Sequence, residues 1–554
     1  MEKVLFIVPP TIMFADFIKP DYNTRIVKKK NGDFTSVTTD MPLGIMSMSS
    51  YIKKYIPVET RLLDLNIVLN KVESFNYNSF VDFFQEAIST LDYEPTIIGI
   101  SSLFTSSYQN MLDIAKCCRN SFTDAVIVAG GGVPTNIYQE IFRDSTCFDA
   151  LCYGEGEKPL LNLIKADNKL KYFEESNSWI TKDKTIKGES FEYDFVEDLD
   201  EIPFYDYDIS NPDEYEINPT ITTYTGVDNR KKSFHVMTSR GCPHRCCFCS
   251  SHTVHGRKMR FNSIDRVRED FIRLKNQYGA VTFIFQDDHF MANKQRALDI
   301  LEILKQLKVT AIFQNGVALY ALDREIIEAF KNVGVNQLVL AVESGSSRVL
   351  KEIMHKSLNL NIVKRVADDC RALGIYSDVN ILLGLPGETK EDIEDARRFL
   401  KTIKANWFRV VIATPLPGSE MLDICLKKNY LKHGFIDCNY KKAVVETEVF
   451  TAEWIQEKAY LLNLELNFIE NSDFRLGDYR TALKGFENAI KAKSNHAFAY
   501  YYASKCYRAL GEFGKAKEYM ATAKRIIDEN PFWSKYAAMF NVEPVWENGK
   551  GALN

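Results

Sequence analysis

The stretch that decides the interpretation of this chain is residues 240–249, which read RGCPHRCCFC. Its cysteines Cys242, Cys246 and Cys249 are spaced Cys-x3-Cys-x2-Cys, and this spacing places three thiolates on one tight loop. Three such thiolates can hold three irons of a [4Fe–4S] cluster and leave the fourth iron open to an exchangeable ligand. The loop therefore predicts an iron–sulfur cluster that can bind a further molecule.

A structural zinc site is the alternative for the same loop. Zinc needs four ligands in a closed tetrahedral set, and His244, His252 or His255 could supply the fourth. Cys247 lies outside the three-cysteine spacing, and we expect that it is not a ligand.

The cysteine loop follows the first strand of a series in which strands and helices alternate. We expect strands at residues 235–238, 281–285, 310–314, 337–342, 376–383 and 409–414, and helices between them at 263–276, 294–307 and 389–403. Consecutive βα units with right-handed crossovers indicate a partial barrel with chemistry at the C-terminal strand ends. A second doubly wound sheet fits the pattern nearly as well.

The N-terminal part of the chain shows an α/β pattern of its own. We expect strands at residues 4–8, 59–65, 96–101, 125–129 and 150–153, with helices at 45–55 and 107–119. Continuous apolar strands separated by helices indicate a parallel, doubly wound sheet. Ligands of such sheets bind outside the carboxyl ends of the strands, where this chain has several small residues.

Two further segments complete the domain organisation. Residues 191–232 are polar, acidic and rich in Tyr and Pro, which indicates a linker. After residue 450 strand signals vanish, and LGDY at 476–479 recurs as LGEF at 510–513, a period of 34 residues. This period resembles the tetratricopeptide repeat (TPR), a helix pair; the tail either caps the catalytic domain or docks a peptide. We divide the chain into domains at 1–190, 191–232, 233–435 and 436–554.

Composition and charge exclude several classes of protein. The 554 residues carry 69 basic and 74 acidic side chains, a net charge of −5, so we expect no nucleic-acid partner. The first apolar run is too short for a signal peptide, and no segment is long and apolar enough for a spanning helix. We therefore expect a cytoplasmic protein whose twelve cysteines are thiols or metal ligands.

The cysteine loop and the strand-end motifs together resemble the radical S-adenosylmethionine (radical SAM) superfamily. Its members carry a CxxxCxΦC loop at the first strand of a partial (β/α)6 barrel, and Φ is an aromatic residue that contacts adenine. Segments 286–288 (QDD), 343–346 (ESGS), 380–388 (NILLGLPGE) and 415–419 (PLPGS) match later strand ends of this barrel. The resemblance implies that SAM is bound by Phe248, Asp287, Asp288, Glu343, Ser344, Asn380 and Leu382.

The resemblance also implies a reaction. The open iron would chelate the amino and carboxylate groups of SAM, and one electron from the cluster would cleave the S–C5′ bond. The 5′-deoxyadenosyl radical would then abstract hydrogen from a carbon that acid–base chemistry cannot activate. The protein would position the substrate and exclude water and oxygen, and it would need an external flavodoxin- or ferredoxin-like electron donor.

The N-terminal domain resembles the cobalamin-binding domain of one large radical SAM subgroup, so that the resemblance covers roughly residues 1–430. It implies cobalamin contacts from Leu43, Gly44, Asp64, Leu65, Ser101, Ser102, Thr105, Gly131, Gly132, Pro134, Thr135, Gly154, Glu155 and Gly156. All eight histidines lie after residue 234 and the DxHxxG signature is absent, so no histidine of this domain can coordinate cobalt. The lower face of cobalamin would be open, water-ligated or covered by another side chain.

With both cofactors, the resemblance implies methylation of an unactivated carbon or of a phosphinate phosphorus. One alternative is a radical cyclisation or rearrangement without methyl transfer; sulfur insertion ranks lower because the other cysteines form no second group. Another is a non-catalytic, metal-bound scaffold whose helical repeats dock a partner, against which the strand-end motifs argue. No motif names the substrate. His289 follows Asp288, and we predict a polar strand-end residue there rather than a proton carrier.

Overall fold

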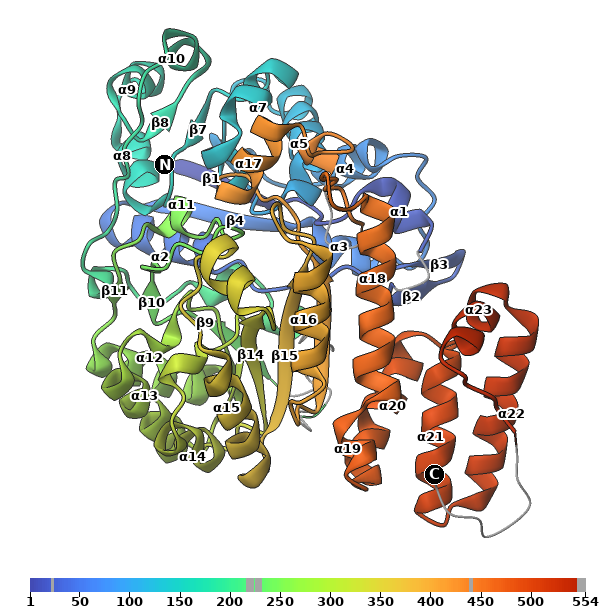
Figure 1. Cartoon of the computed structure of the whole chain (residues 1–554). Coiled ribbons are helices and arrows are strands. Elements are labelled where there is room, and N and C mark those ends of the chain that lie inside the picture. Colours follow the sequence, from blue (N-terminus) through green and yellow to red (C-terminus); the bar gives the residue numbers. More distant parts are fainter. Residues whose placement is uncertain (21–23, 216–223, 225–231, 438–441, 546–554) are drawn as a thin grey trace.

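The N-terminal domain is built on a six-stranded sheet (Figure 1). The structure is a computed structural model that describes residues 1–20, 24–215, 224, 232–437 and 442–545. The strand order is β4-β1-β5-β6-β7-β8, with β8 antiparallel to β7 and the other pairs parallel. The strands are β1 (Glu2–Val8), β4 (Val58–Asp64), β5 (Ile97–Ser101), β6 (Val126–Gly130), β7 (Ala150–Cys152) and β8 (Trp179–Ile180).

Helices cover both faces of this sheet because successive strand residues point to opposite sides. Val4 and Phe6 pack into one apolar core, whereas Leu5 and Ile7 pack into the other. The first core includes α2 (Leu43–Tyr55), α8 (Glu157–Lys165) and α9 (Lys169–Glu175); the second includes α3 (Leu65–Lys71), α4 (Phe80–Ser89), α5 (Tyr108–Ser121) and α7 (Tyr138–Asp144). The predicted doubly wound sheet is confirmed.

Several short N-terminal elements were not predicted. They are α1 (Phe14–Ile18), the hairpin of β2 (Ile26–Lys29) and β3 (Gly32–Thr35), α6 (Gly132–Asn136), β8 and α10 (Lys182–Lys187). Each is too short to show a hydrophobic period in the sequence.

The second domain is an arc of six parallel strands in chain order. One three-stranded sheet has the order β13-β12-β9 and the other β14-β15-β16, and a parallel bridge between Val317 and Leu340 joins them. The strands are β9 (Ser233–Val236), β12 (Thr282–Phe285), β13 (Thr310–Phe313), β14 (Gln337–Glu343), β15 (Tyr376–Leu383) and β16 (Trp407–Ile412). The helices outside it are α12 (Ile264–Tyr278), α13 (Lys294–Leu307), α14 (Arg324–Asn332), α15 (Leu360–Ala372) and α16 (Lys390–Leu400). In contrast, α17 (Glu420–Lys428) lies beside the cysteine loop, where the Met421 amide donates to the Cys247 carbonyl at 2.9 Å.

This order decides between the two folds that the sequence left open. Strands that follow one another around an arc form a partial barrel, because a doubly wound sheet reverses its order at a switch point. The first strand was predicted two residues too late, at 235–238. Phe234 is buried in the barrel core, and the Thr238 amide donates to Asp287 instead of to a neighbouring strand.

The C-terminal region is entirely helical over its described part from residue 451, as predicted. Its helices are α18 (Ala452–Leu464), α19 (Ser472–Arg475), α20 (Tyr479–Ala492), α21 (Ala497–Ala509), α22 (Phe513–Glu529) and α23 (Pro531–Met539). The core of the barrel continues through α18 to Leu466, past the predicted boundary at 435, and α20–α23 share a separate core in the outermost layer (Figure 1). That these helices are TPR repeats stays a prediction.

Buried polar contacts fix the helical tail to the barrel. The Arg371 guanidinium lies 2.7 Å from the Asp473 carboxylate, which also accepts from Asn406 Nδ2 at 3.0 Å. Asp473 is fully buried, so these bonds hold α19 to the barrel.

The predicted linker crosses between the domains in close contact with both. Val196, Leu199 and Ile202 pack into the N-terminal core, whereas Tyr207 and Tyr215 belong to the barrel core. Most of the remainder, residues 216–223 and 225–231, lies outside the described residues. Among the helices of the described residues, none combines the length and the apolar character that crossing a membrane requires.

Candidate active site

The loop that carries the three cysteines is closed at its base by a short antiparallel ribbon. β10 (Ser239–Arg240) pairs with β11 (Arg260–Phe261), so that residues 241–259 form the loop. Gly241 has φ +90°, and a Cβ there would lie 2.4 Å from the Lys258 carbonyl oxygen. Only glycine fits this position, which explains the Arg-Gly-Cys entry to the loop.

The three predicted cluster ligands lie together on this loop. Cys242, Cys246 and Cys249 are half-buried, and the Cys249 amide donates to the Cys246 carbonyl at 3.1 Å. Burial, with the closeness of the other two thiols, raises the pKa of Cys242 to about 11. Iron would displace these thiol protons on binding. Cys247 instead is 3% exposed and packs into the barrel core.

The thiols are not arranged for a single ion. Within the described residues, no three His, Cys, Asp or Glu side chains converge closely enough to hold one metal. A structural zinc site needs such a closed tetrahedral set. The cysteines of a [4Fe–4S] cluster bind different irons and need not converge on one point, so the donor set fits the cluster.

The two carboxylates at the end of β12 have different environments. Asp287 is buried and accepts from Thr238 Oγ1 at 2.8 Å and Ser239 Oγ at 2.6 Å. It therefore braces the connection from β9 to the cysteine loop, and burial raises its pKa. Asp288 is half-buried, and its charge contributes to the raised pKa of Cys242. That Asp288 contacts SAM stays a prediction.

Glu343 ends β14 in a strained conformation beside the cysteine loop. Its φ is +72°, rare for a residue other than glycine, and the register of β14 shifts between Ala341 and Glu343. Its carboxylate lies 3.9 Å from Lys356 Nζ, and the charges of both residues act on the pKa of Cys246. Burial raises the pKa of Glu343. Ser344 is fully buried and accepts from the Ser346 amide at 3.1 Å, so it shapes the turn.

The remaining SAM residues predicted from the sequence belong to β15 and to the cysteine loop. Asn380 and Leu382 alternate along β15 on one face of the strand, half-buried and 9% exposed respectively. Phe248 packs against the edge of the barrel core.

Glu388, in the turn after β15, should make the stability of the barrel depend on pH. It is fully buried, accepts from the Gly384 amide at 2.7 Å, and burial raises its pKa from 4.5 to about 7. Between these values the unfolded chain releases the proton that the folded chain keeps, so stability is full below pH 4.5 and falls as pH rises to about 7. Over this pH interval the free energy of unfolding should fall by roughly 3 kcal/mol.

The Glu388→Gln variant keeps an acceptor for the Gly384 amide but cannot ionise. The difference in apparent Tm between the variant and the parent chain should increase by a few degrees in favour of the variant from pH 5 to pH 8, as this free energy implies. Parallel thermal scans at both pH values test this, and a constant difference would contradict it.

Sequence reasoning missed Lys356 and Tyr320, which lie near His289 and His244 beside the cluster loop. Lys356 lies between the helical segment Val349–Ile353 and α15 and has no motif of its own. His289 Nε2 lies 2.7 Å from the Tyr320 hydroxyl, and the rings of His289 and His244 are 4.9 Å apart. Burial lowers the pKa of His289 to about 4, so this ring is neutral at physiological pH. Only folding brings these groups, from four separate loops, to one strand-end face.

The predicted cobalamin residues gather at the carboxyl edge of the N-terminal sheet. β1 lies between β4 and β5, so the strand order reverses there, and doubly wound sheets bind ligands at this point. A Cβ on Gly131 or Gly132 would lie 2.6 Å from the Ser102 carbonyl oxygen and 2.8 Å from that of Leu103, respectively. These glycines let the ends of β5 and β6 come together.

A small hollow lies between this edge and the barrel. It is lined by Leu103, Phe104, Thr105, Gly132 and Val133 from the N-terminal domain and by Ser250, Leu416 and Pro417 from the barrel. Leu103 and Phe104 are 59% and 44% exposed, which is high for large apolar side chains. Because Ser250 directly follows Cys249, the predicted cobalamin edge faces the cluster loop. The small residues Thr105 and Gly132 at this edge allow a ligand to approach the backbone closely.

Other predicted cobalamin residues have contacts within the protein. Asp64 is buried and accepts from the Asn66 amide at 3.0 Å and the Tyr215 hydroxyl at 3.1 Å. The Gly154 amide donates to Thr135 Oγ1 at 3.1 Å. Leu43, Leu65 and Pro134 are buried, Ser101 is half-buried, Gly44 is exposed, and a Cβ on Gly156 would meet Met48.

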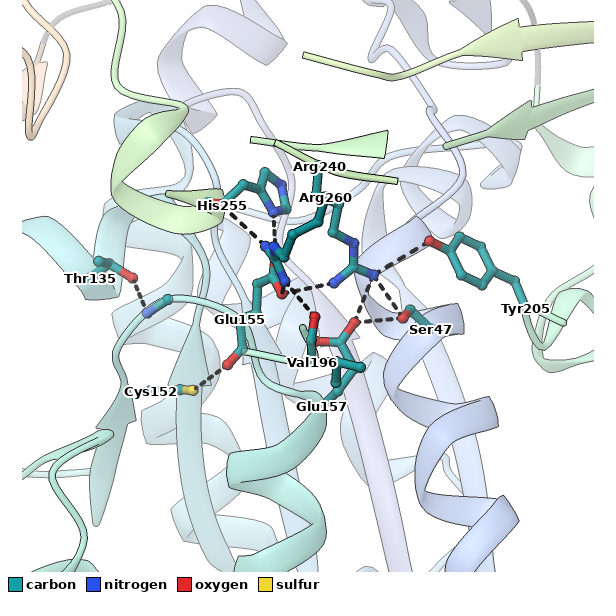
Figure 2. Close-up of polar contacts among 11 residues, drawn as sticks. Ser47, Thr135, Cys152, Glu155, Glu157, Val196, Tyr205, Arg240, His255 and Arg260 are labelled. Carbon is teal, nitrogen blue, oxygen red and sulfur yellow. Dashed lines mark hydrogen bonds and ion pairs between the residues drawn. The ribbon is translucent and has the colours of Figure 1, made fainter. Parts of the chain in front are cut away.

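Glu155 belongs to a buried charge network between the domains (Figure 2). Its carboxylate pairs with Arg240 at 3.0 Å, Arg260 at 2.6 Å and His255 Nδ1 at 2.8 Å. The charge of Arg240 and the hydrogen bonds from His255 and Arg260 hold the pKa of Glu155 well below its usual range despite burial. Glu157, which was not predicted, pairs with Arg240 at 2.8 Å. Glu155 therefore contacts the cluster loop directly rather than the hollow.

Comparisons with known proteins agree with this architecture. Residues 236–400 match the model of the radical SAM superfamily, and residues 41–164 match that of the B12 binding domain. An uncharacterized methyltransferase of Pyrococcus horikoshii is 26% identical over 467 residues, covering 83% of this chain and 92% of the relative. The cytidylyl-2-hydroxyethylphosphonate methyltransferase of Streptomyces wedmorensis is 25% identical over 468 residues, covering 77% and 86%.

A solved structure shares the whole architecture. The cobalamin-dependent S-adenosylmethionine radical enzyme OxsB, with aqua-cobalamin and S-adenosylmethionine bound, matches with a TM-score of 0.58 at 15% identity. The match covers 98% of this chain and 81% of OxsB, and it is a likeness of fold. The cysteine loop, the partial barrel and these matches together show that the chain belongs to the radical SAM superfamily, with a B12 binding domain ahead of its barrel.

Proposed function

We propose that this protein is a cobalamin-dependent radical SAM methyltransferase that acts on an unactivated carbon or a phosphinate phosphorus. The observation that carries the proposal is the hollow in which the predicted cobalamin edge, with Thr105 and Gly132, faces the residue after Cys249. Two cofactor sites that face each other allow one substrate to meet both. Both relatives described above are named methyltransferases, which favours methyl transfer over the alternative of cyclisation or rearrangement.

The residues of the site divide into two groups. Cys242, Cys246 and Cys249 would hold a [4Fe–4S] cluster, which supplies the electron that cleaves SAM, while cobalamin supplies the methyl group. Lys356 and Glu343 carry opposite charges beside Cys246 and suit the carboxylate and ammonium groups of SAM.

Further features of the proposal come from the composition of the chain. Cysteines such as Cys117, Cys118 and Cys506 are buried free thiols, which suits a reducing compartment, so we place the enzyme in the cytoplasm. A flavodoxin- or ferredoxin-like protein would supply electrons. The helices α20–α23 would dock a peptide or protein partner or cap the barrel, and no nucleic acid is expected.

The test is anaerobic reconstitution with iron, sulfide and hydroxocobalamin, followed by desalting and addition of SAM and a strong reductant. We expect cobalt near one equivalent per chain and formation of both 5′-deoxyadenosine and S-adenosylhomocysteine. Deoxyadenosine without bound cobalt would contradict the cobalamin part. Neither product, with no iron retained, would favour the non-catalytic scaffold.

A Leu103→Glu variant tests the proposed cobalamin site independently of the cluster site. Leu103 is 59% exposed, so the change should not disturb folding, but it places a charge on the apolar wall of the hollow. Bound cobalt should fall by about tenfold or more, since an uncompensated polar group in such a contact costs at least ~1.4 kcal/mol. Iron content should not change. Unchanged cobalt would mean that cobalamin binds elsewhere.

A further inference from the structure

The ribbon that closes the cluster loop places two arginines directly opposite each other. Arg240 of β10 pairs with Arg260 of β11, and their side chains are 4% and 2% exposed. Like charges at directly opposed positions of an antiparallel pair are destabilising, and burial removes the screening that water would give. By itself, the barrel therefore has an unfavourable cross-strand pair at the base of its cluster loop.

The compensating charges come from the N-terminal domain. Glu155 bridges the two arginines, with one oxygen 3.0 Å from Arg240 Nη1 and the other 2.6 Å from Arg260 Nη2. Glu157 accepts from Arg240 Nη2 at 2.8 Å and from Ser47 Oγ at 2.5 Å. Figure 2 shows both carboxylates, from the loop after β7 and the start of α8, directed at the guanidinium groups.

The same loop after β7 also contacts the far side of the cluster loop. His255 ends the short helix α11 (His252–His255), and its Nδ1 lies 2.8 Å from Glu155. On the same helix, Thr253 Oγ1 accepts from Asn136 Nδ2 of α6 at 2.8 Å. The base and the C-terminal part of the cluster loop are thus both tied to the cobalamin-binding domain.

These contacts make closure of the cluster loop depend on domain docking. Two carboxylates balance two guanidinium groups in a buried site, so removing one carboxylate leaves an uncompensated cation, which is strongly destabilising. The segment that this destabilises is the ribbon at residues 239–240 and 260–261 and the loop between them. Cys242 is two residues from Arg240, so its position follows that of the ribbon.

We propose that Glu155 and Glu157 are positioning residues for the iron–sulfur cluster, holding the closed base of its loop from the cobalamin-binding domain through Arg240 and Arg260. The proposal rests on the proposed function in that residues 241–259 hold the cluster. It assigns to the Gly-Glu-Gly-Glu segment 154–157 a role in docking the domains onto the cluster loop.

The experiment compares the full-length parent chain with Glu155→Gln and Glu157→Gln. Hydrogen–deuterium exchange of the iron-free protein is followed over residues 241–259, and the reconstituted protein is tested for loss of iron to a chelator and for the EPR spectrum of the reduced cluster. We expect at least threefold faster exchange across the loop in Glu155→Gln, faster iron loss and an altered EPR spectrum. Glu157→Gln, which loses the partner of one arginine only, should show the same changes to a smaller extent.

Asp473→Asn is the matched control, because it neutralises another buried carboxylate that pairs with an arginine across a domain boundary. It should lower Tm without changing exchange at 241–259 or the EPR spectrum. Variants with loop exchange, iron loss and EPR spectrum equal to those of Asp473→Asn would overturn the proposal. If Glu155→Gln does not fold, loop exchange, iron loss and the EPR spectrum of Glu157→Gln decide whether the proposal holds. A parent chain that retains no iron would refute the proposed function, and the exchange data would still test the positioning role.

Discussion

The Cys249→Ala variant is expected to hold no [4Fe–4S] cluster and to produce no 5′-deoxyadenosine from SAM. Cys249 is half-buried, and its amide donates to the Cys246 carbonyl at 3.1 Å. Two remaining thiolates cannot hold a cluster that needs three protein ligands and one open iron. Iron content after anaerobic reconstitution and product analysis with SAM and a strong reductant measure the effect.

Cys247→Ala is the matched control for this experiment. Cys247 lies between two of the ligands in sequence, yet it is 3% exposed and packs with the barrel core. The variant should bind iron and cleave SAM like the parent chain, with a modest loss of stability from the smaller core side chain. Loss of iron in Cys247→Ala, or 5′-deoxyadenosine from Cys249→Ala, would show that the ligands are assigned wrongly.

The Glu343→Ala variant is expected to bind SAM about 10- to 100-fold more weakly, because a charge-assisted hydrogen bond contributes roughly 1.5–3 kcal/mol. Glu343 is held beside Lys356 and Cys246 by a backbone with φ +72°. A positive φ is as unfavourable for alanine as it is for glutamate. The variant therefore removes the carboxylate and leaves the backbone strain unchanged. Binding of SAM to the anaerobically reconstituted protein is measured by calorimetry.

The control for Glu343→Ala is Glu352→Ala. The Glu352 side chain is 61% exposed and lies 3.8 Å from Arg348, on the segment that follows the same strand. Both variants should retain full iron content, and only Glu343→Ala should weaken SAM binding. Equal affinities of the two variants would place the SAM site away from this strand end.

The sequence predicted most of the secondary structure because the local signals were long and consistent. The strand at 376–383 and the helix at 294–307 have the predicted bounds. Gly384 follows the strand, and the Asn293 side chain caps the start of the helix. The N-terminal strands were found because continuous apolar runs mark strands that are covered on both faces. The hairpin at 26–35 and the strand at 179–180 were missed because so few residues show no period.

The sequence predicted those parts of the candidate site whose residues lie close together in the chain. Cys242, Cys246 and Cys249 lie within eight residues, so their spacing alone states that they share a loop. Asp287 shows the limit of that reasoning, because it has the predicted place at a strand end but is bonded to Thr238 and Ser239. Which of two neighbouring carboxylates faces a ligand depends on the direction of the side chain, and this is set by packing.

The sequence by itself determined the two α/β domains, the helical tail and the cysteine loop, because hydrophobic period and short-range spacing encode them. The tertiary structure decided the contacts between distant segments. It brought Lys356 to Cys246, placed the end of β5 opposite Ser250, and set Glu155 between Arg240 and Arg260. Glu155 and Arg240 are 85 residues apart in the chain (240 − 155) and share no pattern. Their pairing arises because burial of two opposed cations is stable only where another domain supplies the anions.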